Sequence, residues 1–208
     1  NEKRQGENQQ HGRVMQEISA QMYPYSHPYS WSTIGSMDDL NAASLDDIKQ
    51  WYRTYYGPNN AVISLAGDIT PERALALVTQ YFGAIPPGPP LPRTQSWIPR
   101  LDSDIRSEME DRVPQARIYR SYHAPAFGDP SIPALSLFAD VLAGSKSARL
   151  ERRLVYEKGL ATSVSAGVND NELAGSFHII VTVKPGVAPA DAEREMDDVL
   201  RELLAQGP

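Results

Sequence analysis

Cysteine is absent from this chain of 208 residues, which excludes disulfides, thiolate metal ligands and cysteine nucleophiles together. Long apolar runs are also missing, because the longest ones have the length of a strand and fall far short of the roughly 18 residues that a membrane-spanning helix needs. The 20 basic side chains are outnumbered by 26 acidic ones and form no run that could follow a phosphate backbone. We therefore expect no membrane span and no nucleic-acid partner.

Recognisable catalytic motifs are missing as well. The histidines are His11, His27, His123 and His178. No two of them lie within a helical turn, whereas histidine pairs at i and i+3 or i+4 are the usual trace of a catalytic zinc site. The chain has no Gly-x-Ser-x-Gly elbow, phosphate-binding loop or dinucleotide fingerprint. Each histidine is therefore interpreted as a loop, surface or hydrogen-bonded core residue, and the basic segment 146–153 as a solvated helix face.

Hydrophobic periodicity and capping residues predict a mixture of helices and strands. Helices are expected over 44–55, 71–82, 134–142, 147–158 and 188–205. Strands are expected over 61–67, 104–112, 116–123, 161–168 and 175–183. Six prolines between Gly83 and Arg100 favour an extended connection. Hairpins mixed with helices predict an α+β fold with a mostly antiparallel sheet and helices packed on one face.

The amino-terminal segment is polar, with apolar residues spaced by four at Val14, Ile18 and Met22. This narrow stripe predicts a surface helix before Tyr23. The helix pattern starts without a cap and the chain does not begin with methionine, so we expect a fragment or a processed piece of a longer protein. Residues 23–31 contain two prolines and four aromatic residues, which predicts an ordered loop held by ring packing.

Four phrases occur in order along the chain. They are Asn-Glu-Lys-Arg-Gln at 1–5, His-Pro-Tyr at 27–29 with Thr-Ile-Gly-Ser at 33–36, Tyr-Gly-Pro-Asn-Asn-Ala at 56–61 running into Ala-Gly-Asp at 66–68, and Arg-Leu at 149–150 followed by Glu-Lys-Gly-Leu-Ala at 157–161. Together they resemble the pitrilysin-type zinc metallopeptidases, or inverzincins, and in particular their bacterial processing-peptidase-like members. In that family an α+β half-subunit is repeated twice in one chain. The resemblance implies a remnant of the metal-binding half over 1–40 and a non-catalytic carboxyl-terminal domain over 41–208.

The resemblance also implies where the chemistry of the parent protein would reside. Members of the family carry an H-x-x-E-H motif that supplies two zinc ligands and the general base, and a distant glutamate completes the ligand set. The motif is not in this sequence, but Glu2 matches the distant glutamate, so Glu2 is expected to be the third zinc ligand of the intact parent. Zinc is thus expected in the parent, whereas the chain by itself is expected to bind no cofactor and to be inactive, with no catalytic residue of its own.

A substrate-binding pair of the family is substituted here. Active relatives place Arg and Tyr seven positions apart, and in the matching register these positions hold Val155 and Thr162. Arg149 and Tyr156 have the same spacing but would shift the better-matched segment by six residues, and this alternative stays open. The substitution implies a zinc-bearing subunit that cleaves peptide substrates together with a second homologous subunit carrying the Arg/Tyr pair.

Two other interpretations remain at this point. The parent could be a structural, non-catalytic subunit of the same fold family, as in the core subunits of respiratory complexes, or the chain could be an unrelated α+β binding domain. An intact H-x-x-E-H motif upstream of Asn1 would support the enzyme, and a degenerate one the structural subunit. The sequence leaves the compartment open between the bacterial periplasm and the cytoplasm.

Overall fold

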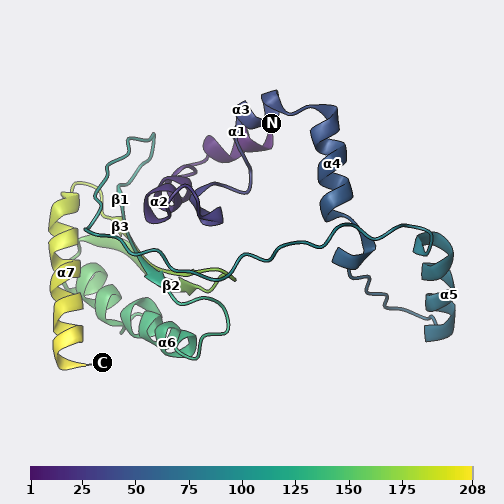
Figure 1. The fold of residues 1–208 in the computed structure, drawn as a ribbon. Coiled ribbons are helices and arrows are strands. Elements are labelled where there is room, and N and C mark those ends of the chain that lie inside the picture. Colours follow the sequence, from purple (N-terminus) through teal and green to yellow (C-terminus); the bar gives the residue numbers. More distant parts are fainter. Residues whose placement is uncertain (208) are drawn as a thin grey trace. The chain divides into compact units, whose positions relative to one another are not determined.

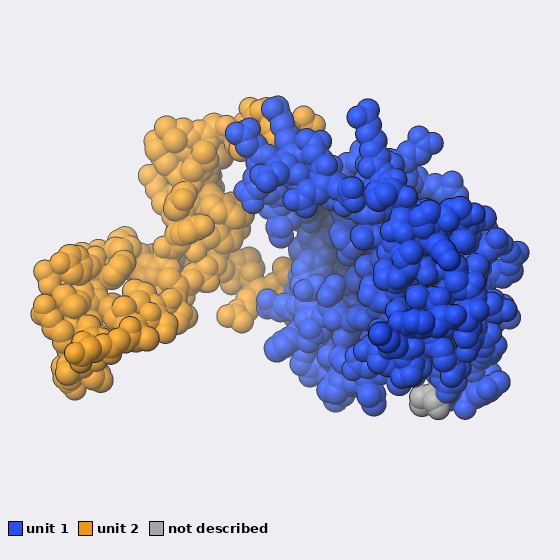
Figure 2. All heavy atoms as spheres, turned by 180° about the vertical axis from the view of Figure 1, so that it is seen from behind, with its two compact units in different colours: residues 1–34, 95–208 blue, residues 35–94 orange. Residues whose placement is uncertain are grey.

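A computed structural model of the protein describes residues 1–207 and divides the chain into two compact units (Figure 1, Figure 2). The first unit combines residues 1–34 with residues 95–208, and the second comprises residues 35–94. Each unit is described by itself. No helix among residues 1–207 is both long and apolar enough to cross a membrane.

The centre of the first unit is a sheet of three antiparallel strands in the order β1-β3-β2. The strands are β1 (Arg117–Ala124), β2 (Ala161–Asn169) and β3 (Gly175–Val183). All three agree with the predicted strands within two residues, because each is a short alternating or apolar run bounded by turn residues. A register shift between Ala161 and Ser163 leaves Thr162 outside the β2–β3 pairing.

Three helical segments cover one face of this sheet (Figure 1). They are α6 (Ile132–Ala143), the π-helix η3 (Glu151–Glu157) and α7 (Pro189–Gln206). Side chains alternate between the faces of a strand, so every second residue of β3 points at these helices. The fully buried core residues include Leu142, Leu150, Leu154, Ile179, Val181, Val183 and Met196. The α+β class and the packing of helices on one face are thereby confirmed.

The other face of the sheet meets the amino-terminal segment. This segment contains α1 (Glu2–Glu7), α2 (Val14–Met22) and the 3₁₀ turn η1 (Pro28–Ser30). The rings of His11 and Tyr119 are 6.2 Å apart, and those of Tyr23 and His123 are 5.1 Å apart. Tyr119 and His123 alternate with the core-facing residues of β1, which places the segment opposite the helices.

The apolar stripe over 14–22 forms a helix as predicted, and a break separates this helix from α1. Between α1 and α2 the chain turns at His11, which has a positive φ of 61°, and at Gly12. A Cβ atom on Gly12 would lie 2.1 Å from the carbonyl oxygen of Gly6, so only glycine fits this turn. The helix that the spacing of Val14, Ile18 and Met22 predicts is α2, and the glycines at 6 and 12 favour the break before it.

The second unit contains helices without a core. Its elements are α3 (Met37–Ala42), α4 (Leu45–Tyr55), the 3₁₀ turn η2 (Pro58–Asn60) and α5 (Pro71–Phe82). Ser44 and Asp47 form a capping box at the start of α4, and the Thr70 hydroxyl accepts a hydrogen bond of 3.3 Å from the backbone of Arg73 at the start of α5. Local signals thus form the helices as predicted. Within residues 35–94, Gly57 is the one buried residue.

Two predicted strands and one predicted helix require correction. Residues 61–67 and 104–112 form no strand in the part of the chain that the structure describes. A strand is stabilised by pairing with a neighbour, and neither segment has one in residues 1–207; the second also carries several charges. The helix predicted over 147–158 starts with a turn, and its last two turns are the π-helix η3.

Candidate functional site

Glu2, the predicted zinc ligand, lies in the first turn of α1 and is exposed. Within residues 1–207, no group of three or more His, Cys, Asp or Glu side chains could hold a metal ion. Glu2 can therefore supply only one of the three or four protein ligands that a zinc ion needs. The residues of this chain do not fit a zinc ion by themselves, and the remaining ligands would have to come from elsewhere in the parent.

A cluster of rings fixes the segment that carries Glu2 to the rest of the first unit. We call it the Tyr23 cluster, and it consists of Tyr23, His27, Tyr29, Trp97 and His123. The Tyr23 ring lies 4.6 Å from the His27 ring, 5.6 Å from the Tyr29 ring and 5.1 Å from the His123 ring. The His27 ring lies 4.8 Å from the Trp97 ring. Ring packing therefore orders residues 23–31, as the sequence predicts.

Hydrogen bonds from the Tyr23 cluster reach the first residue of β3 and the loop before it. The Tyr23 hydroxyl donates to the Gly175 carbonyl at 3.4 Å, and the Tyr29 hydroxyl accepts from the backbone N–H of Leu173 at 3.1 Å. Met22, Tyr23 and Ala174 form a small buried core of their own. Position 175 must be glycine, since a Cβ there would lie 2.2 Å from the Pro125 carbonyl oxygen.

His27 is fully buried, and its two ring nitrogens have different roles. Nδ1 accepts a hydrogen bond of 3.0 Å from the backbone N–H of Tyr29 and so caps η1. Nε2 lies 3.3 Å from the Trp97 carbonyl oxygen, to which only an N–H can be bonded. This arrangement requires the neutral tautomer with its proton on Nε2.

His123 packs edge-on against the Tyr23 ring, and neither of its ring nitrogens has a hydrogen-bond partner among the described residues. Burial lowers the pKa of His123, and the neighbouring His27 acts in the same direction. Burial also raises the pKa of the Tyr23 hydroxyl. Burial therefore favours the neutral forms of His123 and Tyr23.

His178 lies on the same face of the sheet, between two hydroxyls. Its Nδ1 is 2.8 Å from Ser121 Oγ, and its Nε2 is 2.8 Å from Ser176 Oγ. Burial lowers the pKa of His178. A nucleophile–base pair would need a third group that orients the imidazole, usually a carboxylate, and here a second serine takes that place. We interpret this trio as a hydrogen-bonded structural feature of the sheet.

The substituted pair takes part in packing and in strand structure. Val155 lies on η3 and packs against the core, while the Thr162 hydroxyl accepts from Gln115 Nε2 at 3.2 Å and donates to the Thr182 carbonyl at 3.4 Å. No hydrogen bond, ion pair or ring contact joins Glu2 to either residue within residues 1–207. The structure thus does not bring the predicted metal and substrate positions together, and their roles stay predictions.

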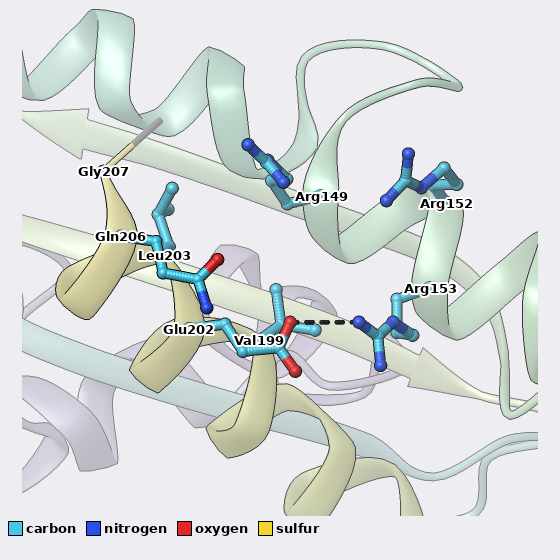
Figure 3. A pocket seen from close by; sticks show the side chains of 8 residues that line it. All are labelled: Arg149, Arg152, Arg153, Val199, Glu202, Leu203, Gln206 and Gly207. Carbon is cyan, nitrogen blue, oxygen red and sulfur yellow. Dashed lines mark hydrogen bonds and ion pairs between the residues drawn. The ribbon is translucent and has the colours of Figure 1, made fainter.

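Arg149 and Tyr156, the alternative pair, are both exposed. Arg149 lines a shallow pocket between η3 and the end of α7, together with Arg152, Arg153, Val199, Glu202, Leu203, Gln206 and Gly207 (Figure 3). Arg153 is held there by Glu195 and Glu202, each at 3.0 Å, so its charge is largely compensated.

The chain matches a protein family over most of its length. The sequence profile described as "Peptidase M16 inactive domain" matches residues 42–208. The zinc protease PqqE of Helicobacter pylori is 27% identical over 180 residues, which cover 85% of this chain and 40% of that protein. The chain therefore spans less than half the length of this curated relative.

Solved structures show the same fold. A protease from Helicobacter pylori superposes on 100% of this chain and 51% of its own with a TM-score of 0.80 at 26% sequence identity. A peptidase M16 inactive domain from Pseudomonas fluorescens superposes on 99% of this chain and 49% of its own with a TM-score of 0.79 at 24% identity. The likeness extends over both units, each of which is thus a piece of a fold that these proteins share.

Proposed function

Because the chain belongs to the peptidase M16 family, we propose that its parent is a zinc endopeptidase in which this chain forms a wall of the peptide-cleavage chamber. The matched region, residues 42–208, is the inactive domain of the family. The match over this region is the observation that carries the proposal. The similarity to a zinc protease of Helicobacter pylori supports zinc as the parent's cofactor.

The residues of the chain support a non-catalytic role for it. One exposed carboxylate, Glu2, is the expected contribution to the metal, and Val155 offers no hydrogen-bond donor to a peptide. We further propose that a second homologous subunit supplies the Arg/Tyr pair to peptide substrates. The core packing of Val155 and the hydrogen bonds of Thr162 support this division of labour, because both side chains are engaged in the fold.

Substitution of Glu2 in the full-length parent tests the proposal. Glu2→Gln should weaken zinc binding by more than the ~10–100-fold that follows the loss of an outer-shell partner. Peptidase activity should fall in parallel. The matched control is Glu7→Gln in the same helix, because Glu7 pairs with Lys3 at 3.4 Å and has no proposed metal role. Metal analysis after dialysis and cleavage of an unfolded peptide are the readouts.

Unchanged zinc content in the Glu2→Gln parent would refute the proposed ligand. A parent that binds no zinc and cuts no peptide, alone or with its homologous partner, would favour the structural subunit instead.

A further inference from the structure

The helices and strands that follow the proline-rich connection form a complete core without residues 35–94. Fifteen buried residues of β1, β2, β3, α6, η3, α7 and the adjoining turns make up one cluster, and none of them comes from the second unit. The sheet is covered on its helical face by α6, η3 and α7. Residues 35–94 are therefore not needed to bury this core.

The second unit, in contrast, leaves its own apolar side chains uncovered. The exposed large hydrophobic residues are Met37, Leu40, Leu45, Ile48, Trp51, Tyr52, Tyr55, Tyr56, Val62, Ile63, Leu65, Ile69, Leu75, Tyr81, Phe82 and Ile85. Isolated exposed apolar residues are normal, but this number within 60 residues marks an interaction surface.

Residues 61–66 define what kind of surface it is. The run Ala-Val-Ile-Ser-Leu-Ala contains no charged residue and does not alternate between apolar and polar side chains. Neighbouring side chains of an extended chain point to opposite faces, yet Val62 is 97% exposed, and Ile63 and Leu65 are about half exposed. A run that is apolar on both faces is typical of an internal strand covered on both sides. In residues 1–207 this run has no ladder partner on either edge.

The two longer helices of the unit show matching apolar stripes. On α4, Leu45, Ile48, Tyr52 and Tyr55 recur at helical spacing and are exposed, while the charged residues lie between them. On α5, Leu75 and Phe82 are exposed two turns apart. A strand and two amphipathic helices are the parts of a layer in which helices cover a sheet.

We propose that residues 35–94 belong structurally to the portion of the parent that precedes Asn1, and that residues 61–66 form an internal strand of that portion's sheet. The open surface is then covered by the core of the preceding portion of the same polypeptide. Strands of that portion pair with both edges of residues 61–66. The inference rests on the proposed function in taking this chain as the carboxyl-terminal part of its parent. It places the structural boundary near residue 94, whereas the family match starts at residue 42.

The length of the relatives supports this occupant. The Helicobacter pylori protease that superposes on the whole of this chain has nearly as many residues again outside the superposed half. A second copy of this chain would fit less well, because one antiparallel partner strand satisfies a single edge of residues 61–66 and leaves the other edge open.

Hydrogen–deuterium exchange of the 208-residue chain and of the full-length parent tests the proposal. In the chain alone, the amides of 61–66 should exchange like those of an unstructured peptide, while β3 (Gly175–Val183) stays protected. In the full-length parent, exchange at 61–66 should slow by on the order of 100-fold or more. Fast exchange at 61–66 in the parent would overturn the proposal. So would protection in the chain alone that rises with its concentration alongside a dimer in sedimentation, because the occupant would then be a second copy.

A pair of variants separates the surface from general stability. In the full-length parent, Ile63→Lys should speed amide exchange at 61–66 by at least tenfold. Leu137→Lys is the control, since Leu137 on α6 is also exposed, at 66%, but lies outside the second unit. Equal exchange at 61–66 in both variants would contradict the proposal. Protection of β3 verifies that each variant is folded, and zinc content and peptide cleavage report separately on the proposed function.

Discussion

At the scale of single residues, His27 is the side chain on which the attachment of residues 1–34 depends most. It is fully buried, caps η1 through Nδ1 and bonds to the Trp97 carbonyl through Nε2. From the sequence, this histidine was one of four isolated ones and was interpreted as a loop or core residue. Tertiary packing brings both His27 and His123 against the Tyr23 ring, and the 95 residues between them in the sequence hide that proximity.

Replacing His27 by alanine should detach the amino-terminal segment. The His27→Ala variant leaves a cavity and two unpaired backbone groups, so we expect a loss of about 2–4 kcal/mol in the free energy of unfolding. Urea denaturation gives the loss, and faster amide exchange over 14–34 would locate it. His11→Asn is the control, because His11 has a positive φ that asparagine tolerates. Equal stability of the two variants would contradict a fixing role for His27.

His123 should make the stability of the first unit depend on pH. Burial lowers its pKa in the folded protein, so the unfolded state binds more protons and folding loses free energy as the pH falls. The free energy of unfolding has its full value above about pH 6.5, the ordinary pKa of histidine. Below that pH it falls by at most about 1.4 kcal/mol per pH unit because of His123. His123→Phe should flatten the stability profile between pH 6.5 and 5.

Other titratable groups also make the stability depend on pH. Burial lowers the pKa of His178 too, so a residual slope should remain in the His123→Phe variant. Glu193 has a lowered pKa because of its hydrogen bonds with Arg106, and its contribution is lost only at more acid pH, as the carboxylate takes up a proton. An unchanged slope in the His123→Phe variant would show that the pKa of His123 is the same in the folded and unfolded states.

At the scale of elements, local signals were sufficient for most of the fold. The capping box of Ser44 and Asp47 predicted the start of α4 to within one residue, and alternating patterns predicted β2 and β3. The strand predicted at 61–67 has the right composition but no partner within residues 1–207, and pairing decides whether such a run becomes a strand. The π-helical geometry of η3 has no simple sequence signal.

The helix α7 should stabilise the first unit through one face only. Met196 is fully buried against the sheet, while Leu204 on the same helix is 77% exposed. Met196→Ala should cost about 2–5 kcal/mol through the lost contacts and the cavity, whereas Leu204→Ala should change stability by less than about 0.5 kcal/mol. Chemical denaturation of the two variants measures the difference, and similar losses would contradict the observed orientation of α7.

At the scale of the whole molecule, the division into units is the feature that sequence reasoning did not anticipate. The phrases of the resemblance suggested a boundary between 40 and 41, and that boundary stays a prediction. In the structure, residues 35–94 form one compact unit and the rest of the chain forms the other. Periodicity identifies which helices and strands form, but it does not say which of them share a core, because that depends on contacts between distant residues.

The isolated chain should therefore have a smaller enthalpy of unfolding than its length of 208 residues predicts. The first unit holds the 34 residues 1–34 and the 114 residues 95–208, and among residues 1–207 only this unit has a buried core. At about 0.7 kcal/mol per residue near 60 °C, its calorimetric enthalpy should be at most about 100 kcal/mol, against about 145 kcal/mol for a fully cooperative chain. Scanning calorimetry measures it, and the larger value would mean that residues 35–94 melt with the rest.

The carboxylate of Glu151 accepts a hydrogen bond of 3.1 Å from the backbone N–H of Val164, on the strand at one margin of the sheet. An amide already bonded to a side chain cannot pair with a foreign strand, so this hydrogen bond opposes strand addition at Val164. Replacing Glu151 by alanine would free the Val164 amide to pair with a strand of another molecule. The purified protein would then form β-aggregates under conditions in which it is still folded.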